Sequence, residues 1–274
     1  MQIIRSEQFS RFPELVHGFS TREWGNMSYR RDADGQAAAN NRAFLSALGI
    51  RPDDTPILDP CLNHGNTVAL LKSRQRTYRP VRLKDSEVRN YSISEPVLTP
   101  DRTICDPYEG IDACWTDEAG ICLTMRPADC AIIMLYDPGT RTIGLMHAGT
   151  VSILSDIVAH AIESAMRWRG LKPRDLHCYA GPSISSAQYD LHKTGLWERG
   201  LKRRIGEIWA RDYDPKALIR RQLMRCGIPD RHIEISPDCT ASRPDLYFSH
   251  HAAGSAEERD SLGRMLAVIG LRRI

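Results

Sequence analysis

The chain reads Ala128-Asp-Cys-Ala-Ile-Ile-Met-Leu-Tyr-Asp-Pro-Gly-Thr-Arg-Thr-Ile-Gly-Leu-Met-His-Ala-Gly149 across its most informative stretch. Two apolar runs flank the turn-forming residues from Asp137 to Thr140, so this stretch predicts a β-hairpin. Strands and helices alternate along the rest of the chain. The hairpin and this alternation together predict a mixed α/β or α+β fold.

The loop of the hairpin sets which residues face each other. A two-residue loop would require a positive φ that proline cannot adopt, whereas a four-residue loop centred between Pro138 and Gly139 does not. With that centre, Cys130 lies directly opposite His147. Directly opposed residues have Cβ atoms about 4.5 to 5.5 Å apart. That separation suits two ligands of one metal ion, and equally a thiol and an imidazole that share a proton.

Each of these two residues also has a purely structural interpretation. A single cysteine beside an apolar strand usually packs in the core, and a single histidine at a strand end usually forms a surface hydrogen bond. Their neighbours favour a functional pair. Asp129 precedes the cysteine, and Ala148-Gly149 lets the chain turn tightly after the histidine. Polar residues at the ends of buried strands are where sites commonly lie.

Working outward, four segments have the pattern of helices, and seven short runs have the pattern of strands. The helices are Gln36 to Leu48, Ser155 to Arg169, about Leu196 to Arg211, and one that begins at Asp214 and Pro215 and stops at Gly227. The strands are Val68 to Leu71, Gly120 to Thr124, Ala131 to Tyr136, Thr142 to His147, Leu176 to Ala180, His232 to Ile235 and Met265 to Leu271.

Composition excludes several classes of protein. The 274 residues are 42% hydrophobic and 26% charged, which excludes a disordered, collagen-like or coiled-coil protein. A net charge of +3 predicts neither a nucleic-acid partner nor a membrane partner. Residues 72 to 84 carry six basic side chains and no acidic one. We interpret this run as a solvated loop in preference to a surface that steers an anion or RNA.

Cysteine usage and hydrophobic run lengths predict a cytoplasmic protein. The eight cysteines are too few for a disulfide scaffold, and no Cys-x-x-Cys pair occurs. The longest fully apolar run, Ala131 to Tyr136, is far shorter than the ~18 residues of a membrane span. The N-terminal residues carry charges where a signal peptide needs an apolar stretch.

Several motifs in this order resemble those of the laccase-domain family, also called the YfiH-type, multicopper polyphenol oxidase-like or peptidoglycan editing factor family. The hairpin pair Ala128-Asp129-Cys130 and His147-Ala148-Gly149 carries most of the resemblance. The other matches are His17-Gly-Phe-Ser-Thr-Arg22, Asn63-His64-Gly65, Asp112-Ala113 with Thr116-Asp117, Gly181-Pro182-Ser183-Ile184 with Tyr189, Asp238-Cys239-Thr240, Tyr247-Phe-Ser249 and Gly263-Arg264.

The resemblance implies a single domain over residues 1–274 with an α+β fold, in which mixed sheets form an α/β/β/α arrangement of layers. It also implies a zinc ion held by His64, Cys130 and His147. Three nitrogen or sulfur ligands leave a fourth position open, as in catalytic zinc sites. Copper suits the same ligands. Asp129, Asp112 or a nearby backbone carbonyl would orient the imidazoles.

The family's activities imply a purine nucleoside phosphorylase that uses adenosine, inosine or methylthioadenosine with phosphate, with adenosine deamination as a second activity. Its other assignments are copper-dependent oxidation of phenols and editing of peptidoglycan precursors. Cys130, His147 and Asp129 are the expected catalytic residues. An arginine near the metal is the natural partner of phosphate, and Arg22 is our candidate, ahead of Arg264 and Arg126.

The sequence also departs from the family's motifs. The family has Trp-Arg-Gly after His147-Ala-Gly149, whereas this chain has Thr150-Val151-Ser152. Further departures are Leu62 in place of glutamine, Ser183 in place of cysteine, and Phe248-Ser-His250-His251-Ala252 in place of Phe-Ser-Tyr-Arg-Arg. Either His250 or His251 could supply an imidazole in place of the missing arginine, although exposure of both is the simpler interpretation.

Three functions therefore stay open. The first is the zinc-dependent phosphorylase, a transferase that needs only small-molecule partners. The second is a metal-free hydrolase in which His147 activates the thiol of Cys130. The third is a zinc-binding module whose catalysis has weakened. A homo-oligomer is compatible with each of them.

Overall fold

The computed structural model describes residues 1–29, 32, 35–60, 62, 64–71, 77–78, 91–92, 97–98, 103–105, 110–189 and 213–273. Two mixed sheets form its centre. Sheet A has the order β1 (Ile3–Ile4), β2 (Leu15–Ser20), β15 (Ala267–Leu271), β10 (Cys122–Met125), β3 (Ile57–Leu58), β8 (Thr103–Cys105) and β7 (Val97–Leu98). Sheet B has the order β14 (Ile233–Ile235), β13 (His177–Ala180), β11 (Ala131–Asp137), β12 (Thr142–Ala148), β9 (Ala113–Thr116) and β4 (Val68–Leu71). A separate pair joins β5 (Thr77–Tyr78) to β6 (Tyr91–Ser92).

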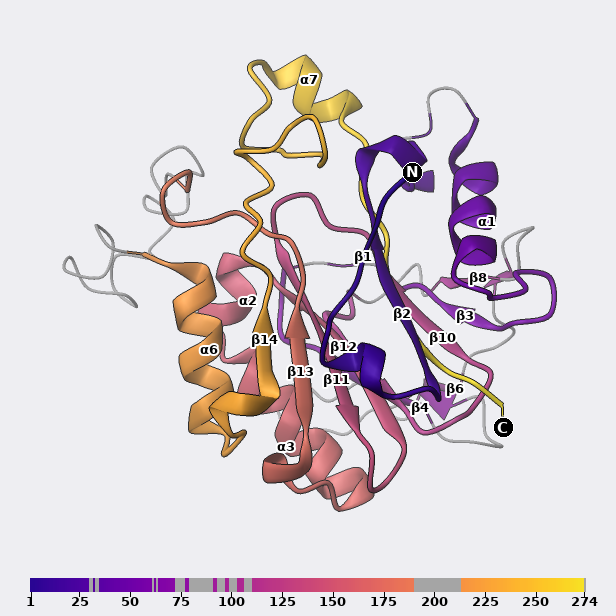
Figure 1. The fold of residues 1–274 in the computed structure, drawn as a ribbon, viewed down its shortest axis with the longest axis vertical. Coiled ribbons are helices and arrows are strands. Elements are labelled where there is room, and N and C mark those ends of the chain that lie inside the picture. The colour runs from indigo at the N-terminus through magenta and orange to yellow at the C-terminus, as the bar shows by residue number, and fades with distance from the viewer. Residues whose placement is uncertain are drawn as a thin grey trace.

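The remaining elements are helices, which flank the two sheets (Figure 1). The α-helices are α1 (Ala37–Ala47), α2 (Thr150–Leu154), α3 (Ile157–Arg169), α6 (Pro215–Arg225) and α7 (Ala256–Ser261). Short 3-10 helices are η1 (Phe9–Arg11), η2 (Arg22–Trp24), η4 (Pro173–Asp175) and η7 (Asp230–His232). Within the described part of the chain, no helix is both long enough and apolar enough to cross a membrane.

Three apolar clusters hold four layers together. One cluster joins the outer face of sheet A to α1, and it includes Val268 and Phe44. A second lies between the sheets, where Met134 and Ile269 are fully buried. The third joins the outer face of sheet B to α3 and α6. This α/β/β/α order confirms the α+β fold class, whereas a single domain over residues 1–274 stays a prediction.

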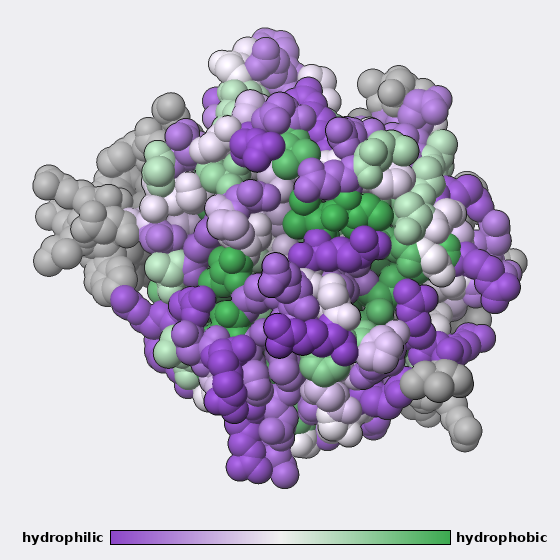
Figure 2. All heavy atoms as spheres, viewed as in Figure 1, coloured by the Kyte–Doolittle hydropathy of each residue, from purple (hydrophilic) through white to green (hydrophobic). Residues whose placement is uncertain are grey.

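The surface complements this distribution of apolar side chains. The face shown in Figure 2 is mostly hydrophilic, with hydrophobic residues in smaller groups near its centre. Strands of sheet B carry apolar residues on both faces because helices cover one face and sheet A covers the other. Strands β11 and β12 are accordingly buried along their whole length.

The predicted hairpin is present as β11 and β12, but its predicted register is wrong. Asp137 pairs with Thr142, and His147 pairs with Ile132 and not with Cys130. The loop has four residues, as expected, but its centre lies one residue later because Asp137 still belongs to the strand. The Asp137 carboxylate accepts hydrogen bonds from the Gly139 N–H at 2.9 Å and from the Thr140 hydroxyl at 3.0 Å.

Most predicted elements are present with small shifts at their ends. The predicted helix from Ser155 to Arg169 begins later, because a left-handed Asp156 (φ 57°) separates α3 from the short helix α2. Asp214 caps α6 as predicted and accepts from the N–H groups of Lys216 and Ala217. The helix predicted from about 196 to 211 lies outside the described residues, as does nearly all of the basic run from 72 to 84.

Candidate metal centre

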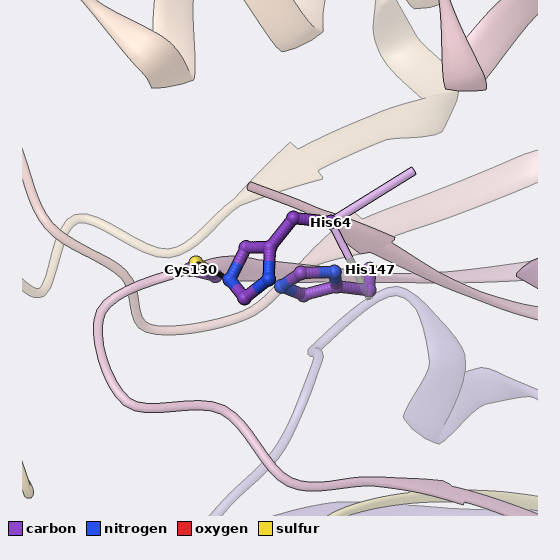
Figure 3. Close-up of side chains that lie close together, drawn as sticks. All are labelled: His64, Cys130 and His147. Carbon is purple, nitrogen blue, oxygen red and sulfur yellow. Dashed lines mark hydrogen bonds between the residues drawn. The ribbon is translucent and has the colours of Figure 1, made fainter. Parts of the chain in front are cut away.

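Three side chains meet where β11 begins and β12 ends. His64 comes from the loop before β4, Cys130 directly precedes β11, and His147 lies near the end of β12 (Figure 3). Their ligand atoms all lie within 4.8 Å of one another. The Sγ atom of Cys130 is 4.0 Å from Nε2 of His64, and the two imidazole rings meet edge to face at 4.8 Å between centroids. Of the three side chains, His64 is exposed, Cys130 is half-buried and His147 is buried.

Cys130 and His147 come together although they do not pair directly. The true register differs from the predicted one by two residues on β11, and side chains alternate between faces with a period of two. Cys130 lies two residues before Ile132, which pairs with His147, so the side chains of Cys130 and His147 are directed to the same face of the sheet. An error of one residue would have placed the two side chains on opposite faces.

A buried carboxylate fixes two of the three candidate ligands. Oδ1 of Asp112 lies 2.8 Å from Nδ1 of His147, so in the neutral imidazole Nδ1 carries the proton and Nε2 is left to bind a metal. The same carboxylate accepts from the backbone N–H of His64 at 3.1 Å and of Gly65 at 2.8 Å. Asp112 itself is fully buried. This side chain thus orients one imidazole and holds the loop that carries the other, as expected of a carboxylate behind metal ligands.

Close approach of the backbone explains the glycine after the histidine. A Cβ atom at Gly149 would lie 3.1 Å from Sγ of Cys130, 3.1 Å from Cδ2 of His64 and 3.2 Å from Cε1 of His147. The φ of Gly149 is −74°, which any residue can adopt, so the restriction is one of space. The three side chains are packed around this glycine.

Cys130 and His147 favour each other's charged forms, so the thiolate is ready to bind a metal, whereas the imidazolium of His147 must first lose its Nε2 proton. Burial raises the pKa of the Cys130 thiol, but the charge of His147 and hydrogen bonds from both histidines outweigh burial and lower that pKa to about 6. Burial lowers the pKa of His147, but the Cys130 thiolate and the Asp112 carboxylate outweigh it and raise that pKa to about 9. A cysteine with this pKa is available as a thiolate, the form that binds a metal.

Asp129 supports the loops around the site. Its φ is 79°, and its carboxylate is buried. Oδ1 accepts from the hydroxyl of Thr240 at 2.6 Å, and Oδ2 accepts from the backbone N–H of His251 at 2.7 Å. The carbonyl of Asp129 accepts from the N–H of Ile184. These contacts join three distant segments beside Cys130, and the expected catalytic role of Asp129 stays a prediction.

The three candidate arginines have different surroundings. Arg22 is exposed, and its guanidinium donates to the carbonyl of Pro244 at 2.9 Å and lies over the ring of Phe248. Arg264 donates to two backbone carbonyls of its own loop. Arg126 is held between Asp59, Asn41 and the carbonyl of Met27, which is a structural network of sheet A and α1. A phosphate-binding role for Arg22 stays a prediction.

The sequence did not reveal a row of aromatic rings beside the candidate ligands. His251 is half-buried and stacks on Tyr189, whereas its neighbour His250 is exposed. Exposure of both histidines, the simpler interpretation, is therefore wrong for His251. The hydroxyl of Tyr189 meets the hydroxyl of Thr150 at 2.5 Å, and its ring lies against Tyr213. Only the motif that carries Tyr189 gave any signal of this row.

The layers and the convergent His-Cys-His group define an α+β protein with a possible metal site, whose candidate ligands lie at one end of the central sheet. A family model described as multi-copper polyphenol oxidoreductase laccase matches residues 16–272. The chain therefore belongs to this family, as the motifs predict.

Relatives in this family carry a consistent name. The purine nucleoside phosphorylase YlmD of Geobacillus stearothermophilus is 33% identical over 171 residues, which are 60% of this chain and 61% of that protein. A purine nucleoside phosphorylase of Staphylococcus epidermidis is 26% identical over 277 residues, which are 96% of this chain and 94% of that protein. The chain spans about three fifths of the length of the first relatives it matches.

Solved structures show the same fold. The hypothetical protein YfiH of Bacillus licheniformis superimposes with a TM-score of 0.73 at 21% identity, over 98% of this chain and 96% of that one. YlmD of Geobacillus stearothermophilus superimposes with a TM-score of 0.69 at 23% identity, over 96% of this chain and 93% of that one. At these identities the likeness concerns the fold alone.

Proposed function

We propose that this protein is a zinc-dependent purine nucleoside phosphorylase. The observation that carries the proposal is the convergence of His64, Cys130 and His147 within 4.8 Å, with His64 exposed to incoming molecules. Two imidazoles and a thiolate are preferred zinc ligands, and a three-ligand set leaves a position open for chemistry. When bound, zinc supplies a Lewis-acid centre with a free coordination position. The relatives' name supports the choice of purine nucleosides as substrates.

The chain's own residues would prepare this site for the reaction. Asp112 holds His147 in the tautomer that presents Nε2, and it fixes the loop of His64, so little reorganisation is needed when metal and substrate arrive. Phosphorolysis joins a phosphate oxygen to C1′ of the ribose and breaks the N-glycosidic bond, and the departing base takes a proton. Arg22 is the proposed partner of the phosphate, since a guanidinium binds such oxygens in pairs.

Deamination of adenosine is the proposed second activity. In that reaction water adds to C6 of the base and ammonia leaves, so inosine forms and no phosphate is consumed. The same metal centre would serve both reactions, because each requires an activated oxygen nucleophile near the purine nucleoside. Copper stays an alternative ion, because a His-Cys-His group suits either metal.

A second candidate function rests on one observation. Cys130, His147 and Asp112 form a thiol–imidazole–carboxylate series, in which the carboxylate orients the imidazole at 2.8 Å. Such a series is typical of cysteine hydrolases that need no metal. Catalysis that survives removal of the metal would favour this function.

The test is an assay of zinc-loaded protein with adenosine and with inosine, each with and without phosphate, followed by chromatography. Release of adenine or hypoxanthine that depends on phosphate and disappears in Cys130→Ser supports the phosphorylase. Conversion of adenosine to inosine supports the deaminase. Activity that persists in a chelator supports the hydrolase, and bound zinc without turnover supports a binding module whose catalysis has weakened.

A further inference from the structure

Apart from the candidate ligands, a second cysteine is surrounded by hydrogen-bond donors. The backbone N–H of Ser185 donates to the Sγ atom of Cys239 at 3.3 Å. Burial raises the pKa of this thiol, but hydrogen bonds from the hydroxyls and backbone N–H groups of Ser185 and Ser242 outweigh burial and lower that pKa below its ordinary value. The surroundings of Cys239 therefore favour the thiolate, which is the nucleophilic form of a cysteine.

An ammonium group lies beside the same thiol. The Nζ atom of Lys216 donates to the carbonyl of Ser236 at 2.9 Å and to that of Asp238 at 2.6 Å, so the segment that carries Cys239 holds this side chain in place. Burial lowers the pKa of Lys216, and the charge of Cys239 is the largest effect that opposes burial. A nearby cation stabilises a thiolate and is typical of reactive cysteines.

A buried hydroxyl next to Cys239 has no hydrogen-bond partner among the residues that the structure describes. Ser183 pairs with Cys239 in a parallel bridge, in which the carbonyl of Ser183 accepts from the N–H of Thr240. Paired residues direct their side chains to the same face, so the Oγ atom of Ser183 lies on the side of the thiol. Ser183 is only 2% exposed, and its Oγ is unpartnered. Because such a group is costly, it indicates a place for one further polar atom.

We propose that Cys239 is a site of oxidation, at which hydrogen peroxide converts the thiolate to a sulfenic acid. In this step Sγ attacks one oxygen of the peroxide, so an S–O bond forms and the O–O bond breaks. The sulfur is oxidised and the peroxide is reduced. The oxygen that joins the sulfur keeps its hydrogen, and the other oxygen leaves as hydroxide. The new S–O group would lie within reach of the unpartnered hydroxyl of Ser183.

Access to the thiol limits the oxidant to a small molecule. Only 9% of the surface of Cys239 is exposed, whereas Cys226 is half-buried. Hydrogen peroxide is not much larger than water and is expected to reach Cys239. A bulky aromatic disulfide reagent is expected to leave this cysteine unmodified while the chain stays folded. Reaction with the small oxidant and not with the bulky one would distinguish Cys239 from an ordinary surface thiol.

The test treats the full chain with hydrogen peroxide, removes the excess with catalase, and then unfolds the protein in the presence of dimedone. Trapping of the sulfenic acid thus does not depend on access, and peptide mass spectrometry measures each cysteine separately. Cys226 is the internal comparison, because it is more exposed than Cys239 but burial raises its pKa. The sulfenic acid is expected to form at Cys239 about tenfold faster than at Cys226. The adduct at this position should be absent in Cys239→Ser.

A second variant tests the place of the new oxygen. Ser183→Ala should shorten the lifetime of the sulfenic acid about fivefold, because one hydrogen bond to it is lost. Ser152→Ala is the matched control, since Ser152 is also fully buried and its Oγ also lacks a partner within the described residues, but it belongs to α2. This control should leave the lifetime unchanged.

Three results would count against the proposal. If the folded chain acquires no dimedone at Cys239, although a chain unfolded in urea before treatment does, peroxide does not reach the thiol and the proposal is overturned. Oxidation of Cys239 no faster than that of Cys226 would show that its surroundings do not activate it, which also overturns the proposal. An unchanged lifetime in Ser183→Ala would overturn the role given to the buried hydroxyl.

Discussion

The Nδ1 atom of His147 lies 2.8 Å from Oδ1 of Asp112, and the same carboxylate receives the backbone N–H groups of His64 and Gly65. One fully buried side chain therefore determines the orientation of one candidate ligand and the position of another. Asp112 contacts two of the candidate ligands but is not itself one of them. Its contribution to metal affinity can therefore be measured separately from theirs.

Asp112→Asn is expected to lower zinc affinity about 10- to 100-fold, the usual effect of removing a carboxylate behind a metal-binding histidine. The amide can present either its oxygen or its NH2 group, so it cannot serve both the imidazole and the two backbone donors equally well. Competition with a chromophoric chelator measures the affinity. Asp117→Asn is the control, because Asp117 lies at the opposite end of β9. An equal loss of zinc affinity in both variants would contradict a specific role for Asp112.

Gly149→Ala is expected to lower zinc affinity while the protein stays folded. The new Cβ atom would lie 3.1 to 3.2 Å from atoms of all three ligand side chains, so these must move apart. Zinc titration and thermal unfolding of the metal-free protein measure the two effects. Gly254→Ala is the matched control, because its Cβ would approach only the flexible carboxylate of Glu258, at 3.4 Å. Wild-type affinity in Gly149→Ala would show that the site tolerates a wider spacing.

His17→Gln is expected to make stability less sensitive to acid. Burial lowers the pKa of His17 to about 4, against 6.5 for the ordinary side chain, and its Nε2 accepts from the N–H of Ser6. The unfolded chain therefore binds more protons than the native one between pH 6.5 and 4, so stability falls as the pH is lowered through that window. The wild type should lose about 3 kcal/mol more than the variant between pH 7 and 4.

Denaturant titrations of both proteins at several pH values measure this difference. His250→Gln is the control, since an exposed histidine should leave the pH dependence unchanged. Parallel pH profiles for the wild type and His17→Gln would mean that other groups cause the acid sensitivity.

Asp137→Ala is expected to destabilise the protein by about 1 to 2 kcal/mol with little change in zinc affinity. Its carboxylate accepts from the Gly139 N–H and the Thr140 hydroxyl, and these bonds shape the hairpin loop at the end opposite the candidate metal centre. Urea unfolding and zinc titration measure the two quantities. Asp175→Ala, which removes an exposed carboxylate, should cost far less. A large loss of zinc affinity in Asp137→Ala would show that the loop sets the register of the ligands.

Local sequence patterns determined much of the fold and part of the site. The apolar runs around Asp137 to Thr140 predicted the hairpin, because a turn between two strands depends on nearby residues. The start of α6 was likewise predictable from Asp214 and Pro215. Cys130 and His147 could be predicted as a pair because a register error of two residues leaves both side chains on the same face of the sheet.

Tertiary structure alone decided what these elements bring together. His64 lies 66 positions before Cys130 in the sequence, and no local pattern marks it; the family motif pointed to it, and the carboxylate of Asp112 positions its loop. Tyr189, Tyr213 and His251 come from separate segments, so their row depends on how the layers pack. The sequence by itself determined which strands and helices form, because those depend on neighbouring residues. Packing between distant segments determined the group of candidate ligands and the row of rings beside it.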